Sequence, residues 1–83
     1  MPYIKKERRH PILMHESHPK DAGELNFLVT SIIHNYIRGA ERINYSLFNE
    51  ITGVLECAKL ELYRRWVVPY EDLKISENGD VKP

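Results

Sequence analysis

The stretch that decides the fold is residues 21–39, DAGELNFLVTSIIHNYIRG. Asp21 and Glu24 stand three residues apart, which is the spacing of a capping box at a helix start. Gly39 suits the left-handed position that ends many helices. Between them, apolar residues recur at steps of three and four, as on one face of an α-helix: Leu25, Leu28, Val29, Ile32, Ile33, Tyr36 and Ile37. The pattern predicts a helix over residues 21–38.

A second amphipathic segment follows at residues 45–67, YSLFNEITGVLECAKLELYRRWV. Asn44 or Ser46 can cap its start. Gly53 and Cys57 form a small patch that another helix can approach closely, within or beside a subunit interface. The apolar stripe comprises Leu47, Ile51, Val54, Leu55, Ala58, Leu62 and Trp66, broadened by Phe48, Cys57, Leu60 and Val67. The segment predicts a long helix with more apolar surface than one partner helix covers.

The N-terminal residues 1–18 predict an extended arm. Each proline in or next to this stretch lacks a backbone donor and biases the preceding residue toward extended geometry: these are Pro2, Pro11 and Pro19. Residues 1–20 carry a net charge of +3. Their basic run at residues 5–10 has too few cations for a nucleic-acid site, so we favour an arm that is solvated or docked on an acidic segment.

Pro69 interrupts the C-terminal part of the second helical pattern. A proline either ends a helix or kinks it, and it is well tolerated in the first turn of a new one. The sequence therefore predicts a short third helix at residues 69–77 and a tail at residues 78–83. Residues 67–83 together carry a net charge of −2, so the C-terminal part of the chain is acidic.

Together these segments predict an all-α protein with a single small domain over residues 1–83. The two long helices are expected to pack as an antiparallel hairpin, joined at residues 39–44, with the kinked short helix and the extended arm attached. A chain of this length barely offsets its ordering cost by burial, and one cysteine allows no internal disulfide. We therefore expect a homo-oligomer, a dimer or higher. The alternative is a compact monomer in which the arm covers the second apolar stripe.

Composition excludes several classes of protein. Twelve basic and twelve acidic residues give a formal net charge of zero, which argues against a nucleic-acid-binding protein. The chain has no apolar run long enough to span a membrane, and its first residues do not resemble a signal peptide. We therefore expect a soluble, cytoplasmic protein.

The sequence contains no pattern of catalytic or metal-binding residues. His10, His15 and His18 lack the spacing of a helical zinc site, so we expect no metal and no cofactor. Cys57 lies on an apolar stripe, which is typical of a small core residue rather than a nucleophile. There is no glycine-rich phosphate loop and no serine nucleophile motif. The sequence predicts a protein that is not an enzyme.

The residues best suited to a ligand lie near the end of the second helix. Adjacent arginines offer forked donors for a phosphate or carboxylate, and neighbouring tyrosine rings can stack on a base. The candidate ligand-binding residues are Tyr63, Arg64, Arg65, Tyr70 and Asn78. The alternative is that the arginines pair with Glu61, Glu71 or Asp72, or with acidic groups of a partner, and are structural.

Several blocks of this sequence resemble a family of short hypothetical proteins found in bacteriophage and prophage genomes. The blocks are MPYIK at residues 1–5, GELNF at 23–27, GVLECAKLELYRR at 53–65, PYED at 69–72 and ENGDV at 77–81. The resemblance implies phage origin and action in the cytoplasm of an infected bacterium. It implies no catalytic activity and no catalytic residue.

Two functional hypotheses follow from these observations. The first is a phage accessory protein that is not an enzyme, binds a host factor or a small anionic ligand, and possesses an anti-defence role in which it sequesters a nucleotide signal. The second is a structural or protein-interaction module, such as an inhibitor of a host protein or a scaffold, with no small-molecule ligand. In both, the first partner is another copy of the chain.

Overall fold

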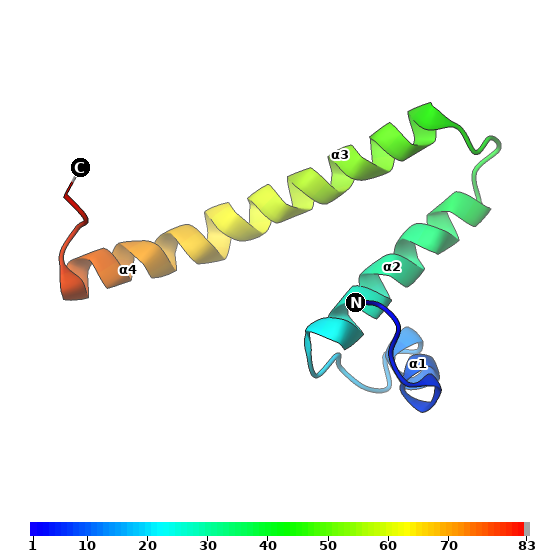
Figure 1. The fold of residues 1–83 in the computed structure, drawn as a ribbon, viewed down its shortest axis with the longest axis horizontal. Helices are drawn as coiled ribbons and strands as arrows, with labels where there is room; N and C mark the ends of the chain where they lie inside the picture. Colours follow the sequence, from blue (N-terminus) through cyan, green and yellow to red (C-terminus); the bar gives the residue numbers. More distant parts are fainter. Residues whose placement is uncertain (83) are drawn as a thin grey trace. The chain divides into compact units, whose positions relative to one another are not determined.

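The computed structural model describes residues 1–82, and these residues form helices with no strand among them (Figure 1). The elements are α1 (Lys6–Leu13), α2 (Ala22–Arg38), α3 (Tyr45–Leu62), the π-helix η1 (Tyr63–Val67) and α4 (Val68–Asn78). The predicted all-α class is therefore confirmed. The chain separates into two compact units, Met1–Asn44 and the part from Tyr45 onward, which we call unit 1 and unit 2.

Helix α2 of unit 1 begins where the sequence predicted. Asp21 is its N-cap, and the Asp21 carboxylate accepts a hydrogen bond from the Glu24 backbone N–H at 2.8 Å. The end of the helix differs from the expectation, because Gly39 has a φ of −85° and not a left-handed conformation. The Gly39 N–H instead donates to the carbonyls of Asn35 and Tyr36, each at 3.2 Å. The helix thus ends in a tightened last turn.

The N-terminal arm is not extended throughout, and this prediction was wrong. Residues Lys6–Leu13 form α1, which contains Pro11. The chain leaves α1 through His15, which has a φ of +58°, and the Pro11 carbonyl accepts the Glu16 backbone N–H at 2.8 Å. A helix of eight residues is too short to be stable on propensity alone. Tertiary contacts with α2 supply the stability that the sequence pattern did not reveal.

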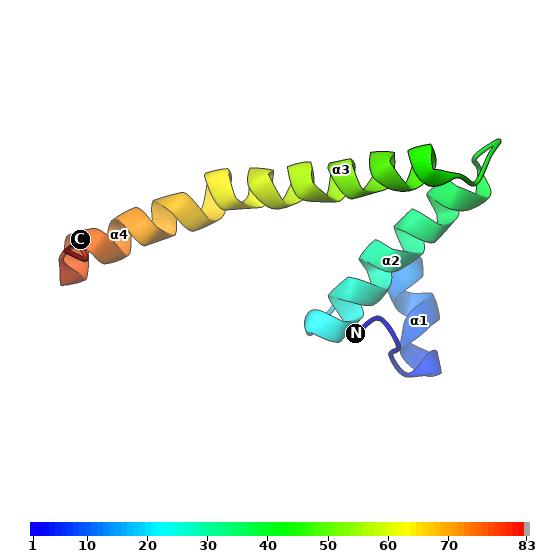
Figure 2. The ribbon, with the colours of Figure 1, turned by 45° about the horizontal axis from the view of Figure 1, so that its top comes forward.

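Unit 1 is held together where α1 packs against α2 (Figure 2). Ile12 on α1 is completely buried, and Glu24 in the first turn of α2 is only 3% exposed. The N-terminal segment passes close to the same turn: a Cβ atom added to Gly23 would lie 3.4 Å from the Met1 carbonyl oxygen and 3.7 Å from Ile4 Cγ2. A side chain larger than alanine at position 23 would therefore displace this segment.

Unit 2 is a continuous helical rod from Tyr45 to Asn78 (Figures 1 and 2). Pro69 lies in the first turn of α4 and does not end the helix. The turn before it is widened instead: the Val68 N–H donates to the Tyr63 carbonyl, which is a five-residue step. Because proline cannot donate to the carbonyl one turn earlier and its ring crowds that carbonyl, a π turn is a way to continue the helix past it. The predicted kink is thus a local widening of the helix to a π turn.

The C-terminal end of α4 is capped by glycine. Gly79 has a φ of +87°, and its N–H donates to the Ile75 carbonyl at 2.8 Å. A left-handed residue is favourable here only because glycine has no Cβ. The tail predicted at residues 78–83 begins after this cap, and Pro83 lies outside the described residues.

Three expectations concern how the units combine: the antiparallel hairpin, the single domain and the homo-oligomer. All three stay predictions. Within residues 1–82, no helix is both long enough and apolar enough to cross a membrane.

Candidate functional site

The five predicted ligand-binding residues all lie on the rod of unit 2. Tyr63, Arg64 and Arg65 belong to η1, whereas Tyr70 lies in the first turn of α4 and Asn78 is the last residue of α4. A helix rises about 1.5 Å per residue, so Asn78 is about 20 Å along the axis from the arginines. The structure therefore brings Tyr63, Arg64 and Arg65 together and leaves Asn78 apart from them.

Arg64 and Arg65 both contact the carboxylate of Glu61. Arg64 Nη2 donates to Glu61 Oε1 at 2.9 Å, and Arg65 Nε lies 3.6 Å from the same oxygen. The side chains of all three residues are more than half exposed, and exposed pairs of this kind add little stability. The contacts match the structural alternative set out above. Ligand binding by these arginines stays a prediction.

The two tyrosines of the predicted site also have partners on the same rod. The Tyr63 hydroxyl donates to Glu71 Oε1 at 2.8 Å, and this hydrogen bond raises the pKa of Tyr63. In an unbroken α-helix, residues eight positions apart are turned about 80° from each other. The π turn removes this offset and lets Tyr63 reach Glu71. Lys74 Nζ lies 5.5 Å from the centre of the Tyr70 ring, a cation–π contact.

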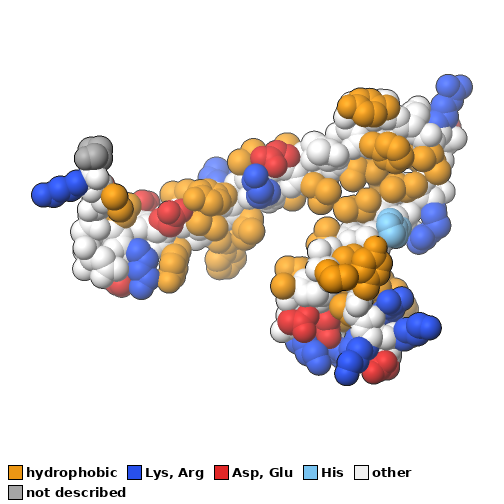
Figure 3. Space-filling model, in the orientation of Figure 1, with side chains coloured by type: hydrophobic (Ala, Val, Ile, Leu, Met, Phe, Trp, Pro, Cys, Tyr) orange, Lys and Arg blue, Asp and Glu red, His pale blue; other side chains and the backbone are white. Residues whose placement is uncertain are grey.

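The rod carries many apolar side chains that remain uncovered (Figure 3). Trp66 is 73% exposed, and Leu55 and Leu62 are also exposed. Cys57 is exposed as well, so the expectation of a small core residue was wrong. Its stripe on α3 has no second helix within unit 2 to cover it. No atom lies within 4 Å of a Cβ added to Gly53, so the predicted close contact at Gly53 is not made within the described chain.

An ion pair between the partly exposed Arg8 and the buried Glu24 lies at the contact of α1 with α2. Arg8 binds Glu24 with two parallel hydrogen bonds, Nε to Oε2 at 2.9 Å and Nη2 to Oε1 at 2.8 Å. Arg8 Nη2 also donates to the Ser17 hydroxyl at 3.0 Å, and the Lys20 backbone N–H donates to Glu24 Oε1 at 3.2 Å. The hydrogen bonds from Arg8 lower the pKa of Glu24 from 4.5 to about 2. Both carboxylate oxygens of Glu24 thus accept hydrogen bonds, which is what a buried carboxylate requires.

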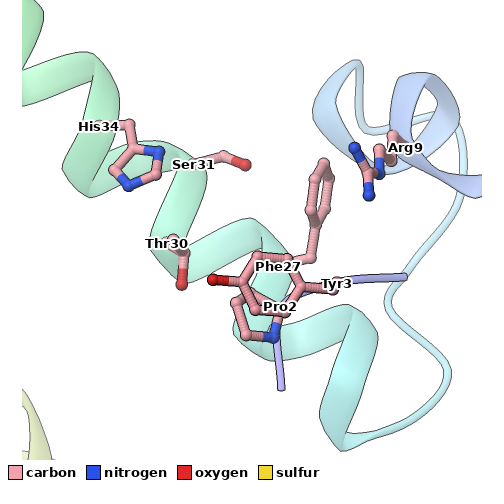
Figure 4. A pocket seen from close by; sticks show the side chains of 7 residues that line it. All are labelled: Pro2, Tyr3, Arg9, Phe27, Thr30, Ser31 and His34. Atoms are coloured by element: carbon pink, nitrogen blue, oxygen red, sulfur yellow. The ribbon is translucent and has the colours of Figure 1, made fainter. Parts of the chain in front are cut away.

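A hollow of about 250 Å³ opens between the N-terminal segment and α2 (Figure 4). It is lined by Pro2, Tyr3, Arg9, Phe27, Thr30, Ser31 and His34. The Arg9 guanidinium lies 5.7 Å from the centre of the Phe27 ring, and Arg9 Nε and Nη2 both donate to the Ile4 carbonyl. These two bonds use two of the five N–H donors of the Arg9 guanidinium, and the other three remain for a ligand. The lining contains cationic and hydroxyl groups and no carboxylate, an arrangement that favours an anion.

Sequence reasoning missed this hollow. Phe27, Ser31 and His34 follow one another at steps of four and three on α2, which is the spacing of one helical face. That signal was present, but Arg9 is 18 residues from Phe27 and no local pattern connects them. The described residues contain no group of three side chains placed to hold a metal ion. His34 alone among the four histidines lines the hollow.

Comparison with known proteins gives one match. A family described as a domain of unknown function (DUF6899) matches residues 1–81. The chain belongs to this family. No curated protein and no solved structure matches the chain. The matched residues cover nearly all of both units. The expectation of an uncharacterised family is confirmed.

Proposed function

We propose that this protein is a protein-interaction module without enzymatic activity, and that the rod of unit 2 assembles with a second copy of the chain. The observation that carries the proposal is the apolar surface of the rod. Leu55, Leu62 and Trp66 are 41%, 56% and 73% exposed. Large exposed apolar surfaces mark sites of protein interaction. A second copy provides a rod of the same length and pattern, and two-fold pairing is the commonest form of assembly.

The arm of unit 1 is already occupied and does not offer the cover that a compact monomer would need. Ile12 and Arg8 are engaged with α2, the former fully buried and the latter bound to Glu24. The monomer alternative relied on this arm to cover the second stripe of the long helix. Self-association is then a way to bury the stripe.

The phage setting belongs to the proposal as well. The resemblance to phage and prophage proteins implies action in the cytoplasm of an infected bacterium. An interaction module in that setting acts by binding, either to a host protein or as part of an assembly. The described contacts of Arg64 and Arg65 with Glu61 favour this module over nucleotide binding at the rod.

The assembly is tested with two variants that add the same charge to α3. Leu62→Glu places a carboxylate on the apolar stripe, whereas Asn49→Glu places one on the far side of the same helix. We expect the wild-type protein and Asn49→Glu to have twice the 9.8 kDa chain mass in native mass spectrometry, and Leu62→Glu to be a monomer. A monomeric wild-type protein, or a dimeric Leu62→Glu variant, would contradict the proposal.

A second candidate function is carried by the hollow of unit 1: binding of a small anion, such as a nucleotide phosphate. Arg9 provides a cation there, and Ser31 and His34 line the same hollow. We expect AMP, and not adenosine, to shift the backbone amide signals of residues 27–34 in a ¹H–¹⁵N titration. His34→Ala should weaken that binding and the control His18→Ala, in the same unit, should not. Equal shifts with adenosine, or none with AMP, would remove this candidate.

A further inference from the structure

The apolar residues of the rod are arranged symmetrically about a point near its middle. Leu55 and Leu62 stand at equal distances on either side of the midpoint between Ala58 and Lys59, and so do Ile51 and Trp66. All four follow steps of three, four or seven, so they share one side of the helix. When two such helices pair antiparallel about that midpoint, Leu55 meets Leu62 of the other copy and Ile51 meets Trp66.

The charges of the rod have the same midpoint. Residues 50–58 carry Glu50 and Glu56 and no basic side chain, a net charge of −2. Residues 59–67 carry Lys59, Arg64 and Arg65 against Glu61, a net charge of +2. An antiparallel pair sets each acidic half against a basic half, whereas a parallel pair sets like charges together. Charge complementarity of this kind selects the orientation of paired helices.

The midpoint falls between Ala58 and Lys59, and Ala58 is small. Ala58 allows two helix backbones to approach closely, as small residues do at helix crossings. Gly53 stands about 140° round the helix from Ala58, so it lies away from this side of the rod. The geometry therefore favours Ala58, and not Gly53, as the centre of the contact.

We infer that two copies of this chain pair through their rods in antiparallel orientation, with the two-fold axis near Ala58. The inference rests on the proposed function, since it specifies how the same surface is used. It assigns to the interface Ile51, Leu55, Ala58, Leu62 and Trp66. Of these, Leu55, Leu62 and Trp66 are exposed and Ile51 is half-buried in the described chain. Arg65 and Glu50 of opposite copies are offset by two residues, about 3 Å along the rods.

Distances between spin labels on the two copies test the orientation. One label is placed on the native Cys57, next to the midpoint, and one on Ser46→Cys in a Cys57→Ser background. Ser46 lies 12 residues before Ala58, so antiparallel pairing separates the two Ser46→Cys labels by about 40 Å. The two Cys57 labels should lie within about 25 Å of each other.

The outcomes separate this inference from the proposed function. A long distance at position 46 with a short one at position 57 is the expected result. Short distances at both positions mean a parallel pair, which would overturn the inference while leaving self-association intact. The absence of any dipolar coupling between copies, at both positions and at high protein concentration, would overturn the proposed function itself. Circular dichroism of each labelled variant confirms that the helices are retained.

Discussion

At the scale of single residues, the Arg8–Glu24 pair shows how a short helix is held. Glu24 is 3% exposed and accepts two hydrogen bonds from Arg8 and one from the Lys20 backbone. It was recognised in the sequence only as part of a capping box. Asp21 does cap α2, but the Glu24 side chain turns to α1 and not back to the cap residue. Local sequence identified the residue, and its partner 16 positions away was not visible in the pattern.

The lowered pKa of Glu24 makes unit 1 sensitive to acid. In the folded chain this pKa is about 2, against 4.5 for an ordinary glutamate. The carboxylate therefore stabilises the fold fully above about pH 4.5, and this contribution is lost as the pH falls toward 2. We expect the Ile12 amide to lose its protection from hydrogen exchange over that range.

A matched pair of variants assigns this acid sensitivity to one carboxylate. Glu24→Gln removes the charge at the ion pair, whereas Glu16→Gln removes one at an exposed position of the same unit. We expect Glu24→Gln to leave α1 poorly protected even at pH 7, and Glu16→Gln to behave as the wild-type protein. Full protection of Ile12 in the wild-type protein at pH 2 would show that the ion pair does not hold α1.

At the scale of elements, the sequence predicted helices whose signals are local and missed those whose stability is tertiary. The helix at Ala22–Arg38 has its cap, its stripe and its end within one stretch of sequence. The helix Lys6–Leu13 has a proline inside it and no side-chain cap, and it depends on Ile12 and Arg8 packing against a helix that begins nine residues after it ends. The hollow beside it was missed for the same reason, because Arg9 and Phe27 meet only in the folded unit.

The π turn shows the same limit in the second unit. Pro69 correctly indicated a disturbance of the long helix, and the predicted kinked third helix appears as Val68–Asn78. The disturbance takes the form of a widened turn, because Pro69 lacks a backbone donor while the flanking side chains keep their contacts. The Tyr63–Glu71 hydrogen bond spans the widened turn, and no local pattern marks that pairing.

Two glycines of unit 2, Gly53 and Gly79, should respond to alanine substitution with opposite changes in stability. Gly53 lies inside α3 with open space around it, so Gly53→Ala should raise the free energy of unfolding by about 1 kcal/mol. Gly79 has a φ of +87°, so Gly79→Ala should lower it by about 1 kcal/mol or more. Urea unfolding followed by circular dichroism measures both. A destabilising Gly53→Ala would mean that another helix does approach Gly53, as the sequence first suggested.

At the scale of the whole molecule, the main feature is the exposed apolar surface of the rod. The width of the stripe on residues 45–67 already indicated self-association, because a chain of this size has little else to bury it. The structure adds that the arm is engaged with α2 and that Leu55, Leu62 and Trp66 remain exposed. The symmetric placement of apolar and charged residues about the midpoint between Ala58 and Lys59 lies within the helix predicted at residues 45–67 and was already present in the sequence.

The most direct test of this central claim is sedimentation equilibrium of the wild-type protein over a range of concentrations. The account predicts a particle of twice the 9.8 kDa chain mass that dissociates on dilution in a single monomer–dimer equilibrium. Leu62→Glu should shift that equilibrium to the monomer, and Asn49→Glu should not. A wild-type protein that sediments as a monomer at every concentration up to about 100 μM, well above the Kd of a stable dimer, would contradict the account.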